Sequence, residues 1–414
     1  MTNVSRDSNN SPLRGPLSRE SMDSKLINNS NLSNPSTPYI SHYSTARTWA
    51  EIDRSALLHN LAAIRSVVGE NSEILAVVKA DAYGHGALEV ARTIVNEIAY
   101  FGVACLDEAL PLLPLGRDVV LLSPCLPTER AEAVAHGLIV TVSSADEAQT
   151  FVQYGHVRAT LKIDTGMGRV GCLPEQTEAA IREILANPRI TLHGIATHLS
   201  AADEDDSFTQ KQLSKFARLH ERLAPLAPNA KCHTHNSAGI FKSGNLENRT
   251  EGAESLSTPF DIVRAGLALY GIAEPSVFQN HLRPALTWKA RVALVRDLPT
   301  GHTISYGHTH TLARPSRTAI VSLGYADGFL RSATDKAQVL IGGRRCPVLG
   351  RITMDQIVVD ITDIASPVQL GDEVVIIGRQ GNEEILATEL ATAADTIAWE
   401  IFTSIHGRIK RFFH

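Results

Sequence analysis

The residue in this sequence best suited to chemistry is a lysine at the end of an apolar segment. Lys79 follows the apolar run Ile74–Val78 and precedes a glycine-containing turn that ends at Gly86. A lysine at the end of a buried parallel strand can point into a site, where burial lowers the proton affinity of its amine. Such an amine is a nucleophile that forms a Schiff base with a carbonyl compound. The alternative is a lysine whose charged end reaches water at the strand end.

The elements that would position Lys79 alternate, from Trp49 onward, between short apolar runs and amphipathic stretches such as Ser55–Val68 and Ser207–Leu226. Eight alternations over about 240 residues predict an α/β fold with an N-terminal (β/α)8 TIM-type barrel at residues 47–285. No GxGxxG follows a strand, which disfavours an open doubly wound sheet. The expected strands are Thr48–Ile52, Ile74–Val78, Tyr100–Cys105, Val119–Leu122, Ile139–Val142, Ala159–Ile163, Thr191–Thr197 and Lys231–His235, with one more apolar stretch at Phe260–Tyr270.

The pattern changes after Leu286 to short strands bounded by turns, which predicts a C-terminal β-rich domain at residues 286–414, closed by one helix at Ala387–Ile405. Residues 1–46 are rich in Ser, Asn and Pro and are predicted to be a disordered tail. Residues 243–258 are polar and are predicted to be an inserted surface loop. The expected strands of the second domain are Trp288–Leu298, Thr318–Ser322, Gln338–Ile341, Arg345–Val348, Ile357–Asp360 and Glu373–Ile377.

Composition excludes several classes of function. The 414 residues carry a net charge of −5, which gives no support for a nucleic-acid partner. No apolar run is long enough to cross a membrane, and no secretory signal core is present. The five cysteines are odd in number and scattered, without a CxxC pair, which suits reduced thiols. We therefore expect a cytoplasmic protein that binds neither membranes nor nucleic acid.

Eight short motifs resemble, in the same order, those of alanine racemases, enzymes that use pyridoxal 5'-phosphate (PLP). The resemblance spans roughly residues 47–411 and implies interconversion of L-alanine and D-alanine, which supplies D-alanine for bacterial peptidoglycan. It also implies a homodimer in which the β-rich domain of one chain completes the barrel site of the other, so that active sites lie at the subunit interface. The motifs are Ala76–Gly86, Lys162–Gly171, Thr197–Asp203, Asn236–Ser237, Val263–Gly271, Ile304–Gly307, Gly324–Gly328 and Gly350–Gln356.

The resemblance gives four residues catalytic roles. Lys79 is implied to carry PLP and to act as the base for the α-proton of D-alanine, while Tyr306 serves L-alanine from the opposite face. A tyrosine is a poor base near neutral pH unless its phenolate is stabilised. His198 and Arg264 match a hydrogen-bond chain that leads away from that tyrosine. Arg264 is also the implied partner of the pyridine nitrogen and, because arginine keeps its protons, it leaves that nitrogen unprotonated.

Other residues match binding positions of the family. Lys162 matches a lysine that many members carbamylate, and the resulting anion would hold Arg169 in place. The resemblance implies no metal site. The implied cofactor-binding residues, besides Lys79 and Arg264, are Tyr83, Arg169, Asn236, Ser237, Gly266, Leu267 and Trp399; the implied substrate-binding residues are Arg169, Met354, Tyr325 and Tyr306; and Tyr325, Asp203, Arg331, Arg351 and Ile397 match the access corridor.

The sequence departs from the family pattern at Trp399, where tyrosine is usual. That tyrosine donates to the phosphate and narrows the inner gate. An indole N–H can still donate, but its reach and bulk differ. The sequence therefore does not decide whether the implied activity is strict for alanine or also accepts serine. Thr353 also stands where many members have cysteine.

Three other functions fit parts of the sequence. His233–His235 and His308–His310 contain the HxH spacing of metal-dependent barrel hydrolases, but neither pair has a clear set of acidic partners. A PLP-binding protein without turnover would lack the second domain and Tyr306. A PLP-dependent decarboxylase would need an acidic partner for the ring nitrogen, where this chain has Arg264, and a cysteine-containing C-terminal motif that is not apparent.

Overall fold

The computed structural model describes residues 45–243 and 261–414. The predicted tail at residues 1–46 and the predicted insertion at residues 243–258 fall almost entirely outside the described residues. Two main sheets are present in the described part, a closed ring of parallel strands and a nine-stranded sheet. No described helix is long and apolar enough to cross a membrane.

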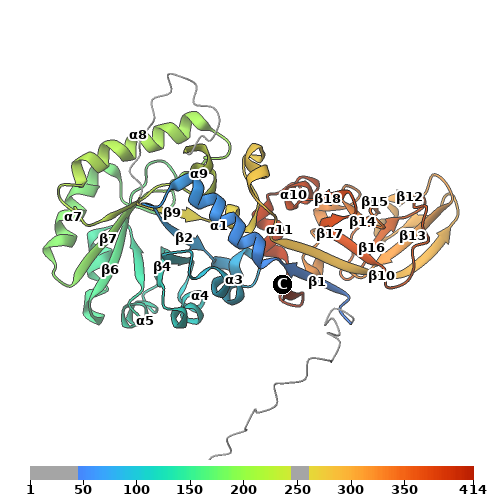
Figure 1. The fold of residues 1–414 in the computed structure, drawn as a ribbon, viewed down its shortest axis with the longest axis horizontal. Helices are drawn as coiled ribbons and strands as arrows, with labels where there is room; N and C mark the ends of the chain where they lie inside the picture. Colours follow the sequence, from blue (N-terminus) through green and yellow to red (C-terminus); the bar gives the residue numbers. More distant parts are fainter. Residues whose placement is uncertain (1–44, 244–260) are drawn as a thin grey trace, which may run out of the picture. The chain divides into compact units, whose positions relative to one another are not determined.

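Eight parallel strands close into a barrel, as the sequence predicted (Figure 1). Neighbouring strands follow chain order, and the ring closes where β2 pairs with β9, with Leu75 opposite Arg264. Most strand residues are buried, as expected of parallel strands that are covered on both faces. The barrel strands are β2 (Glu73–Val77), β3 (Tyr100–Val103), β4 (Asp118–Pro124), β5 (Ile139–Val142), β6 (Val157–Lys162), β7 (Ile190–Ala196), β8 (Lys231–His233) and β9 (Ile262–Ala265).

Helices follow the barrel strands and surround them (Figure 1). The first helix begins after Asp53, whose carboxylate accepts the backbone N–H groups of Ser55 and Ala56 as an N-cap. Asp205 caps the longest helix in the same way through the N–H of Phe208. The helices of this part are α1 (Arg54–Val68), α3 (Ala87–Ile94), α4 (Leu106–Ala109), α5 (Arg130–Ala135), α6 (Ala145–Gln149), α7 (Thr177–Ala186), α8 (Asp206–Leu223) and α9 (Ser237–Ser243).

The second sheet contains the strands that follow the barrel, together with one strand that precedes it. Its order is β18-β17-β14-β15-β16-β13-β10-β1-β19, and β17 pairs additionally with β10. The barrel and this β-rich part confirm the predicted fold class. The strands are β1 (Thr48–Ile52), β10 (Leu286–Leu298), β13 (Ser316–Val321), β14 (Gln338–Ile341), β15 (Arg344–Leu349), β16 (Ile357–Asp360), β17 (Glu373–Gln380), β18 (Glu383–Ile385) and β19 (Lys410–Phe413), with a separate pair β11 (Thr303–Ile304) and β12 (His310–Thr311).

The strand expected to begin the barrel lies elsewhere. Thr48–Ile52 forms β1, which pairs antiparallel with β10 and parallel with β19 in the second sheet. Its placement in the barrel was therefore wrong. The apolar stretch at Phe260–Tyr270 supplies the eighth barrel strand, β9, instead. Residue periodicity identifies a strand but not its partner, and both partners of β1 lie far along the chain.

The last predicted helix is interrupted. Ala387–Ile405 divides into α10 (Ala387–Ala394) and α11 (Ala398–Ser404). Asp395 adopts a left-handed φ of 57°, and its N–H bonds back to the end of α10, which terminates that helix. The apolar pattern runs through the break, so sequence periodicity did not reveal it. The break places Trp399 in the first turn of a separate short helix.

One apolar core extends from the barrel into the second sheet. Its largest fully buried side chains include Trp288 of β10 and Phe329. The ring of Trp288 packs edge-on against Phe329, with 6.2 Å between ring centroids. Strand β1, through Ala50 and Ile52, and the segment before β19, through Ile409, therefore belong to the same packed core as the strands that carry the candidate site.

Candidate active site

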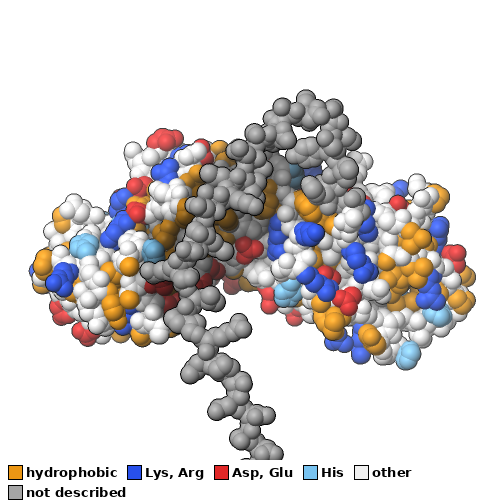
Figure 2. Space-filling view, turned by 90° about the horizontal axis from the view of Figure 1, so that it is seen from below, with side chains coloured by type: hydrophobic (Ala, Val, Ile, Leu, Met, Phe, Trp, Pro, Cys, Tyr) orange, Lys and Arg blue, Asp and Glu red, His pale blue; other side chains and the backbone are white. Residues whose placement is uncertain are grey.

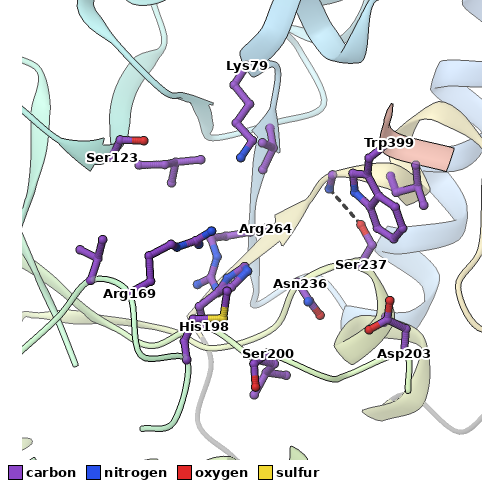
Figure 3. A pocket seen from close by; sticks show the side chains of 18 of the residues that line it. Lys79, Ser123, Arg169, His198, Ser200, Asp203, Asn236, Ser237, Arg264 and Trp399 are labelled. Carbon is purple, nitrogen blue, oxygen red and sulfur yellow. Dashed lines mark hydrogen bonds between the residues drawn. The ribbon is translucent and has the colours of Figure 1, made fainter. Parts of the chain in front are cut away.

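A cavity of about 710 Å³ lies at the C-terminal ends of the barrel strands. This is the end at which barrel enzymes place their active sites. In Figure 3, Lys79, Arg169, Arg264 and His198 point toward one space, with Trp399 and Ser237 beside it. The structure thus brings together most of the predicted site residues: Lys79, Tyr83, Lys162, Arg169, His198, Asp203, Asn236, Ser237, Arg264, Gly266, Leu267, Ile397 and Trp399 all line the cavity.

Lys79 begins a tight turn, labelled α2 (Lys79–Tyr83), which Val78 separates from the end of β2. The four residues from Ala80 to Tyr83 have left-handed φ angles between 51° and 54°. Non-glycine residues rarely adopt this conformation, and it persists where surrounding contacts enforce it, often at functional sites. One such contact is Glu108, whose carboxylate accepts the N–H groups of Ala80 and Ala104, each at 2.7 Å.

The C-terminal end of the chain also holds this turn. The Nε atom of Arg411 in β19 donates to the Gly84 carbonyl oxygen at 3.0 Å, and its other nitrogens donate to the carbonyls of residues 405, 406 and 409. Gly84 lies so close to α11 that a Cβ atom there would stand 2.2 Å from the Phe402 oxygen. The turn that begins at Lys79 is therefore in backbone contact with α11, the helix that carries Trp399. Both side chains also line the cavity.

His85 packs beneath the turn as a fully buried, neutral imidazole. Its ring lies against Tyr270 and Phe402, at centroid distances of 4.4 and 4.9 Å. Its Nδ1 atom is 2.9 Å from the Tyr83 oxygen, so Nδ1 carries the proton. Burial lowers the pKa of His85 to about 4.

This burial predicts acid-sensitive stability. In the unfolded chain this histidine binds a proton near pH 6.5, its ordinary pKa. In the folded protein His85 stays neutral until the pH falls to about 4. The unfolded state therefore binds more protons between these two pH values, and the free energy of unfolding falls as the pH falls through this window. When the pH is lowered from about 7.5 to about 5.5, the free energy of unfolding of His85→Gln should fall by about 1 kcal/mol less than that of the wild type. Urea unfolding at the two pH values measures this, with His136→Gln as the exposed control. A wild-type pH dependence in His85→Gln would contradict it.

Basic side chains line the cavity together with three carboxylates. The basic residues are Lys79, Lys162, Arg169 and Arg264, and the acidic ones are Asp203, Glu204 and Glu274. Burial, followed by the nearby Arg169 charge, lowers the pKa of Lys79 from its usual range. Burial, with the charges of Arg264 and Arg169, holds the pKa of Lys162 well below the usual lysine value. A lowered pKa leaves more of each amine neutral and nucleophilic. Arg169 and Arg264 remain cations, and each favours an anion such as a carboxylate beside it.

Arg264 and His198 form one hydrogen-bonded unit. The buried Arg264 Nη2 donates to the carbonyl oxygens of Thr197 and Thr234, at 2.8 and 3.0 Å, and lies 3.3 Å from His198 Nδ1. Arginine only donates, so Nδ1 accepts and the His198 proton sits on Nε2. Burial and then the Arg264 charge lower the pKa of His198 to about 2. Neutral His198 therefore offers its Nε2–H as a donor.

The opposite end of the cavity is built from backbone and hydroxyl groups. Ser237 Oγ accepts the N–H groups of Gly266 and Ala268, at 3.0 and 3.2 Å. Asn236 lines the cavity, and its Oδ1 caps α9 by accepting the Gly239 N–H. Burial raises the pKa of Tyr83 to about 12, so its phenol remains a donor. In Figure 3 the Trp399 indole lies beside Ser237.

Arg169 is presented by a loop that one carboxylate organises. Asp164 accepts the backbone N–H groups of Gly166, Met167 and Gly168, at distances from 2.8 to 3.1 Å. These bonds lower the pKa of Asp164, although burial alone would raise it. The conformation of the loop between β6 and Arg169 is therefore fixed by hydrogen bonds to Asp164, which belongs to the loop itself.

Several predicted site residues lie away from the cavity. Tyr306, Tyr325 and Met354 do not line it, and their exposed fractions are 71%, 39% and 54%. Arg331 and Arg351 do not line it either. The structure of one chain thus does not bring Tyr306 to Lys79.

These outlying residues lie on adjacent segments of the β-rich part. Tyr325 donates its N–H to the Thr353 oxygen at 3.0 Å, which places it beside Met354. Ser305 Oγ donates to the Arg351 oxygen at 2.5 Å, next to Tyr306. Adjacent segments therefore expose two tyrosines and a methionine to solvent.

Sequence reasoning missed Glu108 and Asp164, which hold the two loops that carry Lys79 and Arg169. A signal existed for Asp164, because aspartate before a glycine-containing turn commonly accepts the following backbone N–H groups. Glu108 had no such signal, since its bond to Ala80 joins residues 28 positions apart.

The HxH pairs do not converge on a metal site. Across residues 45–243 and 261–414, no three His, Cys, Asp or Glu side chains gather closely enough to hold a metal ion. His235 Nδ1 bonds with the Thr234 hydroxyl at 2.5 Å, and His310 Nδ1 lies 3.1 Å from Asp335. The hydrolase alternative therefore has no support in this geometry.

Comparison with known proteins agrees with this geometry. The family model described as "Alanine racemase, N-terminal domain" matches residues 52–274, and "Alanine racemase, C-terminal domain" matches residues 285–413. The chain belongs to the alanine racemase family. It is therefore an amino-acid racemase, an isomerase, as the sequence predicted.

Relatives within the alanine racemase family are similar over most of their length. The alanine racemase of Methylacidiphilum infernorum is 39% identical over 91% of this chain and 94% of its own. The alanine racemase of Symbiobacterium thermophilum is 40% identical over 88% of this chain and 97% of its own. The crystal structure of alanine racemase from D-cycloserine-producing Streptomyces lavendulae has a TM-score of 0.79 at 34% identity, covering 89% of this chain and 97% of that one.

Proposed function

We propose that this racemase interconverts L-alanine and D-alanine with PLP, using Lys79 as the base on one face of the substrate and Tyr306 as the base on the other. The observation that carries the proposal is the Lys79 amine, which points into the cavity at the C-terminal ends of the barrel strands and has a lowered pKa. A buried lysine with a lowered pKa is the nucleophile that a carbonyl cofactor requires.

The residues present fit PLP. Arg264 Nη1 is buried and has no hydrogen-bond partner within the described ranges, so it can donate to an acceptor such as a pyridine nitrogen. At the other end, a Cβ atom at Gly266 would stand 3.0 Å from Tyr83 Oη and 3.6 Å from Ser237 Oγ. Glycine keeps that space open beside two hydroxyl groups and backbone amides. Tyr83 and Ser237, with the neighbouring amides and the Trp399 indole, would hold the phosphate, and Asn236 would support them as the cap of α9.

PLP, when bound, supplies the electron sink that makes the α-proton of an amino acid removable. Lys79 would hold the cofactor and, once its amine is free, would remove or return the proton of D-alanine. Burial and then the Arg169 charge lower its pKa, which makes the neutral amine, the form that accepts a proton, more available. Arg264 stays protonated, so the ring nitrogen would receive a hydrogen bond rather than a full proton.

Tyr306 would exchange the α-proton of L-alanine from the opposite face. The Tyr306 phenolate would need a hydrogen-bond donor to stabilise it. The Nε2–H of neutral His198 is such a donor, and the contact of Arg264 with Nδ1 orients the His198 ring. Arg169, which lines the cavity, would bind the substrate carboxylate together with the Met354 N–H. Tyr325 and Tyr306 would crowd the substrate side chain, which favours a methyl group, since each excluded methylene is worth about 1–3 kcal/mol.

Lys162 would stabilise Arg169 as a carbamate. Burial and the nearby Arg264 and Arg169 charges depress its pKa, which favours the neutral amine, the form that attacks CO2. An N–C bond forms and one proton is released, so a neutral amine becomes an anion. An anion there offsets the charges of Arg169 and Arg264, which otherwise repel a protonated Lys162.

We further propose a homodimer in which the β-rich domain of one chain completes the barrel site of the other. The exposure of Tyr306 and Met354, together with their absence from the cavity of their own chain, supports this arrangement. Figure 2 shows hydrophobic side chains exposed among basic ones on the β-rich part. Exposed aromatic, methionine and arginine side chains are typical of protein interfaces.

Mixing two inactive variants tests the dimer and both bases together. Lys79→Ala keeps Tyr306, and Tyr306→Phe keeps Lys79, so a mixed dimer contains one intact site and one doubly altered site. Random exchange makes half of the dimers mixed, each with one of two sites intact, so about a quarter of wild-type activity should return. Activity that stays at the sum of the two variants after subunit exchange would contradict a shared site.

The cellular role follows from this chemistry. We propose that the chain supplies D-alanine for peptidoglycan and works in the cytoplasm, where its five free thiols would remain reduced. No substrate of another class is favoured by the cavity.

A further inference from the structure

Gln212 is a buried glutamine of α8 that uses all four of its hydrogen-bonding positions. Its Oε1 accepts the Ser200 N–H at 2.9 Å and the Ser200 hydroxyl at 3.1 Å. Its Nε2 donates to the Thr165 hydroxyl at 3.2 Å and to the His198 carbonyl oxygen at 3.0 Å. Only 1% of the residue is exposed. The amide orientation is fixed by its partners, because the Ser200 N–H can only donate and the His198 carbonyl can only accept.

These four bonds connect two loops of the candidate site. Thr165 belongs to the loop after β6 that presents Arg169, whereas residues 198–200 belong to the loop after β7 that presents His198. The Thr165 hydroxyl also meets the Thr197 hydroxyl at 2.7 Å, and Thr197 donates to the Ile163 oxygen at 2.9 Å. The network therefore ties the backbone on both sides of His198 to the Arg169 loop.

Helix α8 braces the Arg169 loop at a second point. A Cβ atom at Gly166 would stand 2.9 Å from the Phe208 ring, so Phe208 packs directly on the loop backbone. Gln212 lies one helical turn further along the same helix. The helix thus fixes the positions of both loops relative to each other.

We propose that Gln212 is a positioning residue that holds the His198 backbone where its ring can accept from Arg264 and donate toward Tyr306. This inference rests on the proposed function, in which His198 supports proton transfer on the L-alanine face. Removing the Gln212 amide takes away the hydrogen-bond partners of the Ser200 N–H and the His198 carbonyl, both partly buried, and both groups must move to find new ones. Small displacements of oriented groups slow catalysis by up to about 100-fold.

The expected effect is specific to one face. Gln212→Met keeps the length and apolar bulk of the side chain but removes its hydrogen bonds. The Tyr306 proton transfer should slow, while the Lys79 transfer should not. With α-deuterated alanine, the primary isotope effect on kcat/KM should therefore rise in the L-to-D direction and fall in the D-to-L direction. A smaller folded fraction would change neither isotope effect.

The test compares Gln212→Met with Gln210→Met, the same change at an exposed position of the same helix. Gln210→Met should match the wild type. A readout independent of turnover is amide hydrogen exchange over residues 197–203, which should accelerate only in Gln212→Met. If Gln212→Met does not fold, Thr165→Val removes one partner of the same amide and should shift the isotope effects in the same directions.

Tyr306→Phe in the same assay distinguishes a failure of the role of Gln212 from a failure of the proposed function. If it shifts the isotope effects and Gln212→Met does not, the role of Gln212 is overturned and the proposed function stands. If Tyr306→Phe leaves both isotope effects unchanged, the two-face assignment fails, and the role of Gln212 fails with it. Faster amide exchange without shifted isotope effects would reduce Gln212 to a structural residue and overturn the proposal.

Discussion

Lys79→Ala is expected to abolish racemisation and the visible absorbance of covalently bound PLP. Lys79 is the lysine at the end of β2 that faces the cavity, and alanine can neither bond to the cofactor nor move a proton. Activity should fall by at least about 1,000-fold, because both the covalent and the acid–base roles are lost. Absorbance spectroscopy and a racemisation assay on the purified variant measure the two losses.

The control for this variant is Lys336→Ala, which removes a lysine that is exposed on the β-rich part. It should keep wild-type absorbance and activity. If Lys79→Ala retained both properties, Lys79 would not be the cofactor lysine, and the chemistry proposed for the cavity would be wrong.

Tyr306→Phe is expected to lose α-proton exchange mainly from L-alanine. The substitution removes only the phenolic oxygen, so packing at the exposed turn stays the same. Exchange of the α-proton of L-alanine with deuterated solvent should slow by about 100- to 10,000-fold, the range typical of one acid–base group. Exchange from D-alanine should remain close to the wild-type rate, because Lys79 serves that face.

Nuclear magnetic resonance in D2O follows this exchange for each enantiomer separately. Tyr154→Phe, at another exposed tyrosine, is the matched control and should change neither rate. Equal losses from L-alanine and D-alanine in Tyr306→Phe would contradict the assignment of one base to each face.

Much of the fold was predictable because the barrel signal is local. Each barrel strand is a short buried run followed by an amphipathic segment, and this alternation is readable in one pass along the chain. The errors arose where the structure depends on distant partners or on a single residue. The pairing of β1 with β10 and β19 is one case, and the break at Asp395 between α10 and α11 is the other.

The candidate site was predictable to a different extent. Lys79, Arg264 and His198 stand at ends of barrel strands or just beyond them, so sequence motifs place them near one cavity. The partners that fix their geometry, Glu108 and Gln212, carry no local pattern and bond to residues that are distant in sequence. Tyr306 could be nominated from its motif, but a single chain leaves it away from the cavity.

The most direct test of the central claim is racemisation of a panel of L-amino acids by the purified protein, with and without added PLP, followed by chiral chromatography. We predict turnover that depends on PLP, with alanine well ahead of serine and larger residues. Serine turnover equal to that of alanine would keep the mechanism but show that Trp399 does not restrict the side chain. Absence of alanine racemisation in the presence of PLP, or racemisation that needs no PLP, would contradict the proposed PLP-dependent activity.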